Sequence, residues 1–374
     1  MLYNINSVIK YFDNLYRMKK ILTVIGARPQ FIKASSISRE IIKRRGVNEI
    51  IVHTGQHYDE NMSSIFFDEL SIPKPNYNLG IGGSSHGLMT GRQLEAIEKV
   101  LIDENPDCVI VYGDTNSTLA GALAAAKMNI PLAHVEAGLR SFNRSMPEEI
   151  NRILTDHASN ILFTPTNTAS SNLLNEGIHE ALIKNVGDVM FDASIFFKEK
   201  ARKPLWIESS DNQLSDFVLA TIHRAENTDN PYKLKKIFDG LSASPIPVIV
   251  PLHPRTKSKL NNQNIKVSKN IYLVEPVGYL EMIWLENNCS IVCTDSGGVQ
   301  KEAYFFQKPC LTLRDETEWV ELVDTGWNTL VGCNEEAIIQ GIREFKSPKD
   351  NLALYGDGNS SKLIVDELLN ADII

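Results

Sequence analysis

The sequence lacks the features that mark membrane proteins and secreted proteins. No apolar run approaches the ~18–20 residues that a bilayer-spanning helix needs. Charged and polar residues interrupt the first twenty positions, so we expect no secretory signal there and treat residues 1–18 as a short extension outside the fold. These absences favour a soluble protein.

Long blocks of lysine or arginine are also missing. The chain has 374 residues and a formal net charge of −8, because 46 acidic residues outnumber 38 basic ones. A chain with this balance does not offer the basic surface that attracts nucleic acids or anionic membranes. We therefore expect neither as a partner.

Cysteines are few and their spacing is uninformative. The five cysteines form no CxxC pair and the histidines form no HExxH motif, so the sequence indicates neither a disulfide framework nor a metal site. Cys108 and Cys293 lie in apolar, strand-like runs, where a cysteine acts as a small hydrophobic residue. Reduced thiols are typical of the cytoplasm, which is the location we predict.

The common glycine-rich nucleotide motifs are absent as well. No Walker A sequence occurs, and the nearest approach to GxGxxG, at residues 80–85, follows no convincing strand. The dinucleotide motif needs a strand before it and a helix after it. The sequence therefore disfavours a redox reaction.

From residue 21 onwards, short β-branched runs alternate with amphipathic stretches. The expected strands are 21–25, 49–53, 108–112, 132–136, 161–164, 217–222, 248–252, 271–274, 290–294 and 310–313. The expected helices are 31–45, 87–105, 115–129, 147–159, 279–286 and 299–306. Such alternation predicts parallel sheets that are covered by helices on both faces.

A pause in this alternation, near residues 184–204, divides the chain. The length and the number of strands then predict an α/β protein of two doubly wound, Rossmann-type domains. We place the N-terminal domain at 19–190 and the C-terminal domain at 191–359. The last helix, within 360–374, is expected to return to the first domain.

Three acidic residues fall in loops that follow strands, where doubly wound domains bind their ligands. Asp114 is either a functional acid or a helix N-cap, and Glu148 is either functional or a first-turn acid beside Pro147. Glu136 ends an apolar strand and precedes Ala-Gly. That position favours a buried, paired or catalytic carboxylate.

Other loops carry groups suited to an anionic ligand. The string Asp295–Gly298 joins a strand to a helix, so it is either a phosphate site or an ordinary capped helix start in which Ser296 or Asp295 is the cap. Glu302, one turn further on, is in reach of a ribose diol. Arg28 and Lys33 open the first helix, where they either grip a ligand or are solvated helix residues.

The histidines divide by position. His223 and Arg224 follow the first strand of the second half, where a proton-exchanging group and a phosphate-binding cation favour a functional role. For His57 and His253 a functional and a structural role stay equally open.

A series of strings, in order along most of the chain, is shared with one known family. They are Gly26-Ala-Arg-Pro-Gln-Phe-Ile-Lys33, Tyr112-Gly-Asp-Thr115, His134-Val-Glu-Ala-Gly-Leu-Arg140, Pro147-Glu-Glu-Ile-Asn-Arg152, His223-Arg-Ala-Glu-Asn227, Thr294-Asp-Ser-Gly-Gly-Val-Gln300 and Leu313–Glu318. As an ordered set they resemble the non-hydrolysing UDP-N-acetylglucosamine 2-epimerases.

The resemblance implies a GT-B-like pair of Rossmann domains with the active site in the cleft between them, and a homodimer. It implies interconversion of UDP-GlcNAc and UDP-ManNAc without a metal or nicotinamide. The catalytic set that it implies is Asp114, Glu136, Glu148 and His223. The substrate-binding residues that it implies are Arg28, Lys33, Arg140, Arg224, Asn227, His253, Ser296, Gly297, Gly298, Glu302 and Arg314. The candidates for an allosteric site are Gln56, His57 and Arg255.

The chemistry of an acetamido sugar supports this reaction. Its C2 hydrogen is not next to a carbonyl, so deprotonation alone gives no stabilised enolate. Elimination of UDP across C1–C2 gives a 2-acetamidoglucal, and UDP can then add back with the proton on the opposite face of C2. We assign the proton transfers to Glu136 and Asp114, without deciding which one removes the proton, and a supporting role to Glu148. His223 and Arg224 would stabilise the diphosphate.

Three departures from the family's common form remove negative charge or add positive charge. Gln30 and Lys301 each stand where glutamate is usual, and Arg255 stands where a neutral residue is usual. The UDP-2,3-diacetamido-2,3-dideoxyglucuronate 2-epimerases act on a sugar with an extra carboxylate and are more similar in these strings. We therefore predict that the substrate is either UDP-GlcNAc or this uronate, of which the charge differences favour the uronate, for synthesis of a surface polysaccharide.

Three alternatives to this function stay open. A GT-B glycosyltransferase with a UDP-sugar donor would show no exchange at C2 without an acceptor. A hydrolysing 2-epimerase would release free ManNAc and UDP. A catalytically silent sensor of nucleotide sugars would lose the acidic residues, which are all present here.

Overall fold

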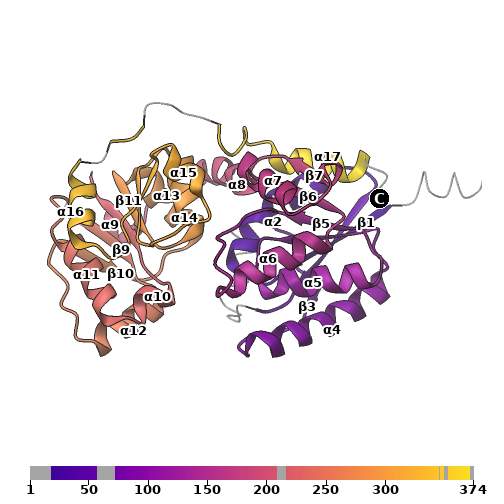
Figure 1. Ribbon diagram of the computed structural model, residues 1–374, viewed down its shortest axis with the longest axis horizontal. Coiled ribbons are helices and arrows are strands. Elements are labelled where there is room, and N and C mark those ends of the chain that lie inside the picture. The colour runs from indigo at the N-terminus through magenta and orange to yellow at the C-terminus, as the bar shows by residue number, and fades with distance from the viewer. Residues whose placement is uncertain (1–17, 57–71, 209–215, 345, 349–352, 371–374) are drawn as a thin grey trace, which may run out of the picture. The chain divides into compact units, whose positions relative to one another are not determined.

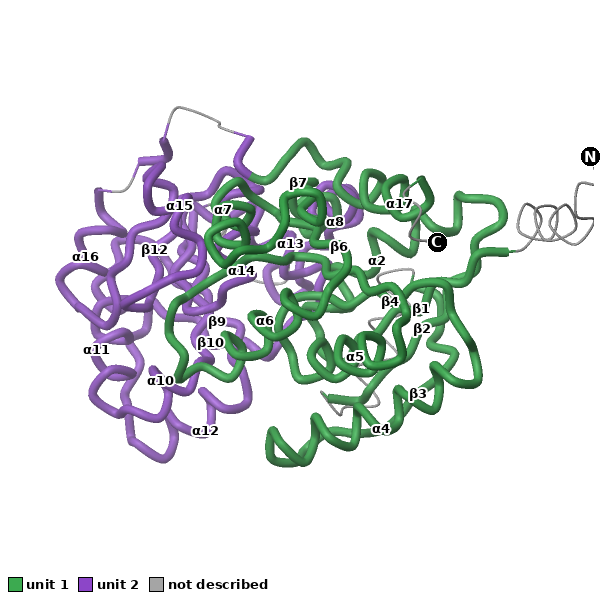
Figure 2. The backbone as a smooth tube through the Cα atoms, turned by 45° about the vertical axis from the view of Figure 1, so that its right-hand side comes forward, with its two compact units in different colours: residues 1–193, 355–374 green, residues 194–354 purple. Residues whose placement is uncertain are grey.

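The chain forms two compact units, each built on one parallel sheet. The computed structural model describes residues 18–56, 72–208, 216–344, 346–348 and 353–370 (Figure 1). Unit 1 comprises Met1–Ala193 and Tyr355–Ile374, and unit 2 comprises Ser194–Leu354 (Figure 2). Among the described helices, none combines the length and the apolar character that crossing a bilayer requires.

The sheet of unit 1 has seven parallel strands in the order β3-β2-β1-β4-β5-β6-β7. They are β1 (Lys19–Ile25), β2 (Val47–His53), β3 (Tyr77–Asn78), β4 (Cys108–Tyr112), β5 (Leu132–Val135), β6 (Ile161–Thr164) and β7 (Ile183–Asn185). The strand order reverses between β1 and β4. The loops that follow these two strands therefore diverge, which is the position where doubly wound sheets bind ligands.

Helices cover both faces of this sheet. They are α2 (Arg28–Ile42), α4 (His86–Glu104), α5 (Asn116–Lys127), α6 (Pro147–Ala158) and α7 (Asn167–Asn175), with a 3₁₀ turn at Glu180–Leu182. The chain passes from unit 1 to unit 2 within α8 (Val189–Lys198), and α17 (Ser360–Asn370) belongs to unit 1. Leu22 and Val24 point to the face that α4 and α5 cover, where they join Ile97 and Val109 in one apolar cluster. Alternate residues of β1 point to the other face, which α2 covers.

Unit 2 repeats the plan with six parallel strands in the order β10-β9-β8-β11-β12-β13. They are β8 (Val218–Thr221), β9 (Val248–Pro251), β10 (Ile271–Val274), β11 (Ile291–Thr294), β12 (Cys310–Thr312) and β13 (Asn328–Leu330). The helices are α9 (Leu205–Glu208), α10 (Ala225–Thr228), α11 (Pro231–Ser242), α12 (Pro254–Asn262), α13 (Tyr279–Asn288), α14 (Gly297–Phe305), α15 (Val320–Asp324) and α16 (Glu335–Glu344). Here the order reverses between β8 and β11.

The prediction of an α/β fold with two doubly wound sheets is confirmed. Each of the ten expected strands is present, with ends that differ by a few residues. The sequence reading missed three short strands, β3, β7 and β13, which have two or three residues each. All three lie at sheet edges, where a strand needs apolar side chains on fewer sides and so carries a weaker pattern.

The last helix, α17, packs against α2 in unit 1 although the whole of unit 2 precedes it in the chain (Figure 1). Asp192 of α8 caps its first turn. One carboxylate oxygen accepts from Ser360 N at 3.1 Å, and the other accepts from Ser361 N at 2.7 Å and Ser361 Oγ at 2.6 Å. The side chain of Asp192 is buried, so these bonds replace the water that it loses.

We expect Asp192→Ala to lower the free energy of unfolding by about 1–3 kcal/mol, because it leaves buried N–H groups of the α17 terminus without an acceptor. Urea titration measures the change. Asp366→Ala is the matched control: it removes an aspartate on α17 that pairs with Arg44 at 2.6 Å while partly exposed, and an exposed pair contributes less than about 1 kcal/mol. Equal losses in the two variants would contradict the capping role.

Candidate active site

The loop after β1 is tied to β4 by one buried amide. Gln30, in the first turn of α2, is 1% exposed. Its Oε1 accepts from Gly26 N at 2.8 Å and Ala27 N at 3.1 Å, and its Nε2 donates to Tyr112 O at 2.9 Å and Thr118 Oγ1 at 3.0 Å. The Gln30 side chain, which we interpreted as a loss of negative charge near the ligand, therefore lies inside unit 1, where its amide cannot meet a ligand.

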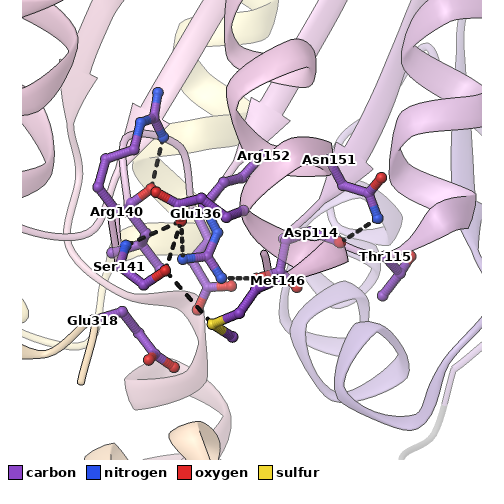
Figure 3. Close-up of polar contacts among 12 residues, drawn as sticks. Asp114, Thr115, Glu136, Arg140, Ser141, Met146, Asn151, Arg152 and Glu318 are labelled. Carbon is purple, nitrogen blue, oxygen red and sulfur yellow. Dashed lines mark hydrogen bonds and ion pairs between the residues drawn. The ribbon is translucent and has the colours of Figure 1, made fainter. Parts of the chain in front are cut away.

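The loop after β4 presents Asp114 beside α6. Thr115 caps α5 by accepting from Thr118 N at 3.2 Å, so the N-cap alternative for Asp114 is wrong. The Asp114 carboxylate pairs with Arg152, and its backbone oxygen accepts from Asn151 Nδ2 at 2.9 Å (Figure 3). The side chain of Asp114 stays partly exposed while that of Arg152 is buried. The buried arginine therefore fixes the position of a carboxylate that a ligand can reach.

Glu136 follows β5 in a strained conformation and pairs with Lys33 of α2. Its φ is +70°, a region that costs a residue other than glycine about 1–3 kcal/mol. Phe163 O holds the turn by accepting from Glu136 N at 3.1 Å and Ala137 N at 3.0 Å. Glu136 is 9% and Lys33 7% exposed, so each charge compensates the other in a mostly dry setting.

Gly113 lies between these groups and has to be glycine. Its φ is +62°, and a Cβ there would lie 3.0 Å from Lys33 Nζ and 3.2 Å from Glu136 Oε2. The residue that precedes Asp114 is thus in contact range of the Glu136 pair. The structure brings Lys33, Asp114 and Glu136 together at the carboxyl ends of β4 and β5.

The two glutamates that open α6 have different roles. Glu149 is buried and accepts from Ser141 N and Ser141 Oγ at 3.0 Å, from Phe142 N at 2.9 Å and from Arg152 at 3.1 Å. It therefore anchors the loop before α6. Glu148 is exposed in the first turn, and its carboxylate has no hydrogen-bond partner within the described parts of the chain. Of the two, Glu148 is the one open to a ligand.

Arg140 is buried in ion pairs. Its guanidinium donates to Asp156 at 2.7 Å and to both oxygens of Glu176 at 2.7 Å. Burial would raise the pKa of Asp156, but the charges of His134 and Arg140 outweigh burial and hold that pKa below its usual value. With these partners, Arg140 orders the loop after β5, and contact with a substrate would need one of the pairs to open.

In unit 2, Asp295 orders the loop that carries His223. Asp295 is fully buried at the end of β11. Its carboxylate accepts from His223 N at 3.1 Å, Arg224 N at 3.0 Å and Asn227 Nδ2 at 3.1 Å, and Oδ1 lies 3.4 Å from His223 Nδ1. The half-exposed His223 ring therefore directs Nδ1 towards Asp295. Its centroid lies 5.8 Å from that of His253.

The N-terminus of α14 combines a cap with two glycines. Ser296 Oγ accepts from Val299 N at 3.5 Å, so Ser296 is the N-cap. A Cβ on Gly297 would lie 2.4 Å from Glu318 Oε1, whereas a Cβ on Gly298 would be 3.9 Å from its nearest neighbour. Arg314 donates to the Glu318 carboxylate at 2.8 Å. Close backbone approach is thus possible at Gly298, while Glu318 covers Gly297.

The remaining predicted residues are placed as follows. Arg28 is partly exposed. Glu302 is buried and accepts a hydrogen bond from Tyr279 OH at 3.4 Å. Lys301 is also buried, and its Nζ lies 4.1 Å from the centre of the Trp319 ring. Because it is buried, Lys301 adds no charge to a binding surface.

The three candidates for an allosteric site are placed as follows. Gln56 accepts from Ser117 N at 3.0 Å and from Ser117 Oγ at 2.8 Å, and Arg255 pairs with Asp229 at 2.5 Å. His57 lies outside the described residues.

Sequence reasoning missed the charged residues that hold the site. His134, Glu149, Arg152, Asp156 and Asp295 are all buried. The sequence assigned none of them to holding the site, and Asp295 was considered only as a helix cap. A signal was available for Asp295, because an acid directly after an apolar strand needs a partner. Arg152 and Asp156 lie four residues apart on α6, so they share a helix face, but that spacing is equally typical of a solvated face.

A family model for UDP-N-acetylglucosamine 2-epimerase matches residues 39–369. Individual relatives match almost the whole chain, among them the following two. UDP-2,3-diacetamido-2,3-dideoxy-D-glucuronate 2-epimerase of Pseudomonas aeruginosa is 56% identical over 356 residues, which cover 93% of this chain and 99% of that relative. UDP-N-acetylglucosamine 2-epimerase of Methanocaldococcus jannaschii is 47% identical over 358 residues, which cover 92% and 98%.

Solved structures agree with the sequence matches. The Methanocaldococcus jannaschii enzyme in complex with UDP-GlcNAc and UDP has a TM-score of 0.84, covering 94% of this chain and 99% of that one. The Neisseria meningitidis UDP-GlcNAc 2-epimerase bound to UDP-GlcNAc has a TM-score of 0.85 at 34% identity, with coverage of 94% and 99%. Since sequence and structure agree over nearly its full length, the chain belongs to the UDP-N-acetylglucosamine 2-epimerase family.

Proposed function

We propose that this protein is a non-hydrolysing isomerase that inverts C2 of a UDP-2-acetamido sugar by elimination and re-addition of UDP. The observation that carries the proposal is the pair of carboxylates, Asp114 and Glu136, which unit 1 holds against buried cations at the carboxyl ends of β4 and β5. Family membership supplies the UDP-sugar as substrate class. Retention of these acids speaks against a sensor that only binds.

The reaction needs proton transfer at C2 on both faces of the sugar. A base takes the C2 proton while the C1–O bond to UDP breaks, and the electron pair of the C–H bond becomes the C1–C2 double bond. An acid then protonates C2 from the other face, and the UDP oxygen adds to C1. Asp114 and Glu136 are proposed for these transfers, because general acids and bases must lie within hydrogen-bond reach of the carbon's proton.

The cations of unit 1 have a second consequence for the proton transfers. Arg152 and Lys33 each place a positive charge against one of the proposed proton-transfer carboxylates, Asp114 and Glu136, and so compensate its negative charge. Lys33 also offers a proton that Glu136 can exchange through their contact. The exposed Glu148 would orient the substrate or share this work, as its position in the first turn of α6 permits.

In unit 2, the leaving UDP is the group to be held. Ser296, Gly298 and the free N–H groups of α14 are proposed for the diphosphate, since a helix N-terminus stabilises negative charge. Asp295 orients His223 and Arg224, which are proposed to stabilise the charge that develops on the departing diphosphate. Glu302 is proposed for the ribose.

The uronate is the substrate that we propose, on the strength of the match to the Pseudomonas aeruginosa enzyme. The three charge differences noted in the sequence do not supply the reason, because Gln30 and Lys301 are buried and Arg255 pairs with Asp229.

Assembly and location belong to the same proposal. We propose a homodimer, which light scattering on the purified protein tests. The cysteines of the chain are free, and burial raises the pKa of Cys108 and of Cys310 to about 12, so these thiols are inert. Free thiols and a UDP-sugar substrate both fit a cytoplasmic enzyme.

Proton NMR in heavy water tests the function. With UDP-2,3-diacetamido-2,3-dideoxyglucuronate we expect the C2 epimer to form with solvent deuterium at C2, without release of free sugar and without an acceptor. The same assay with UDP-GlcNAc at equal concentration is expected to be slower. Equal or faster turnover of UDP-GlcNAc would remove the uronate proposal, and an epimer that keeps its original hydrogen would remove the elimination mechanism.

Glu136→Gln removes a proposed proton-transfer group without changing its size. We expect deuterium incorporation at C2 to fall by about 10²–10⁴-fold, with UDP binding retained in calorimetry. Glu95→Gln, which changes an exposed glutamate on α4 that pairs with Lys99, is the control and should keep the wild-type rate. Unchanged exchange in Glu136→Gln would exclude Glu136 from the proton transfers.

Gly113→Ala tests the packing between Asp114 and the Glu136 pair. The new Cβ would meet Lys33 Nζ and Glu136 Oε2 at a positive φ, so we expect kcat to fall by about 100-fold, the effect of displacing a catalytic group by roughly 1 Å. Gly91→Ala in α4 meets open space and should leave kcat unchanged while stabilising the helix by about 1 kcal/mol. Equal kcat values in the two variants would argue against this geometry.

A further inference from the structure

His134 is a buried titratable residue that the proposed reaction does not use. It lies in β5, two residues before Glu136, and is fully buried. Its Nδ1 is 2.7 Å from Asp156 Oδ1, and its Nε2 is 2.7 Å from the carbonyl oxygen of Gly113. Both ring nitrogens therefore face oxygen acceptors from other elements, one from α6 and one from the loop after β4.

These contacts define the protonation of the ring. A carbonyl oxygen can only accept, so Nε2 carries a hydrogen. Asp156 is ionised, because it also accepts from Arg140 at 2.7 Å and from Gly138 N at 3.2 Å, so Nδ1 carries a hydrogen as well. His134 is therefore an imidazolium. Its positive charge is part of a network of ion pairs in which the negative charges of Asp156 and Glu176 compensate the positive charges of His134 and Arg140.

The acceptor at Nε2 is the peptide group that joins Gly113 to Asp114. Gly113 N donates to Val135 O at 3.0 Å, so both polar backbone groups of Gly113 are bound to β5 residues. Gly113 also packs against Lys33 Nζ and Glu136 Oε2. A rotation of the Gly113–Asp114 peptide would therefore move the Asp114 carboxylate and open space beside Glu136.

We propose that His134 is a positioning residue for the epimerase reaction, which rests on the function proposed above. By donating from Nε2 to Gly113 O, the imidazolium fixes the peptide before Asp114 and so sets the position of Asp114 relative to Glu136. Asp156 and Arg140 hold the ring in place and compensate its charge. The hydrogen bond from Nε2 to Gly113 O positions Asp114 for catalysis, and the ion pair of Nδ1 with Asp156 compensates the charge of the ring.

Two substitutions at His134 separate these bonds. The amide nitrogen of glutamine can replace Nε2, and that of asparagine can replace Nδ1. We expect His134→Gln to retain most of the wild-type kcat, because Gly113 O keeps its donor. We expect His134→Asn to lower kcat by about 100-fold, with KM little changed because the residues proposed to bind UDP lie in unit 2. Both variants should lose thermal stability to a similar degree.

A residue that only stabilises the fold would give a different pattern. In that case kcat per folded molecule would fall equally in both variants or in neither, and either result would overturn the proposal. A change in KM with constant kcat would also overturn it, because displaced acids act on the chemical step.

Nitrogen NMR of histidine-labelled protein gives a second measurement that needs no substrate. We expect both ring nitrogens of His134 to have protonated-type shifts, because both face oxygen acceptors, and a signal from one unprotonated nitrogen would overturn the imidazolium. In Asp156→Asn, the new amide can donate to Nδ1, so Nδ1 should lose its proton while Nε2 keeps it and kcat falls by less than in His134→Asn. Loss of the Nε2 proton with full kcat would overturn the positioning role.

The two proposals fail in distinguishable ways. If wild-type protein shows no C2 exchange with either UDP-sugar, the proposed function fails and the positioning role fails with it, while the NMR result for the imidazolium still stands. If wild-type protein is active and His134→Asn is equally active, the positioning role fails and the function stands.

Discussion

Charge compensation at the carboxyl ends of β4 and β5 is the constraint on which the candidate site depends. Two carboxylates emerge there on adjacent strands, and a buried carboxylate without a partner costs several kcal/mol. Lys33 reaches Glu136 from α2, and Arg152 reaches Asp114 from α6. Because the partners come from different helices, the site can form only when both helices are packed on the sheet, so folding and assembly of the site are the same event.

Each unit uses a buried acid to order a loop that follows a strand. In unit 1, Asp156 holds His134 and Arg140, and in unit 2, Asp295 accepts from the backbone at His223 and Arg224. Loops on a protein surface are commonly mobile. A carboxylate that accepts from several donors removes this freedom and keeps the side chains of the loop in one arrangement, as a preorganised site requires.

The sequence was sufficient for the α/β class and the ten main strands, because buried parallel strands give continuous apolar runs that stand out between amphipathic helices. It was insufficient wherever a role depended on a partner far along the chain. Asp114 and Thr115 are adjacent candidates for the same helix cap, and only the structure assigns that cap to Thr115. Gln30 and Lys301 read as charge changes near a ligand, yet both side chains point into their own units. The pairs Lys33–Glu136 and Arg152–Asp114 span 103 and 38 positions, so no local pattern encodes them.

The return of α17 to α2 makes unit 2 an insertion within unit 1. Unit 2 is one continuous stretch, 194–354, whereas unit 1 is completed by a segment that is translated after it. During synthesis, chains fold from the N-terminal end as each domain becomes available. Unit 2 can therefore reach its final form on the ribosome while unit 1 still waits for its last helix, so the unit that carries Asp114 and Glu136 is the later one to mature.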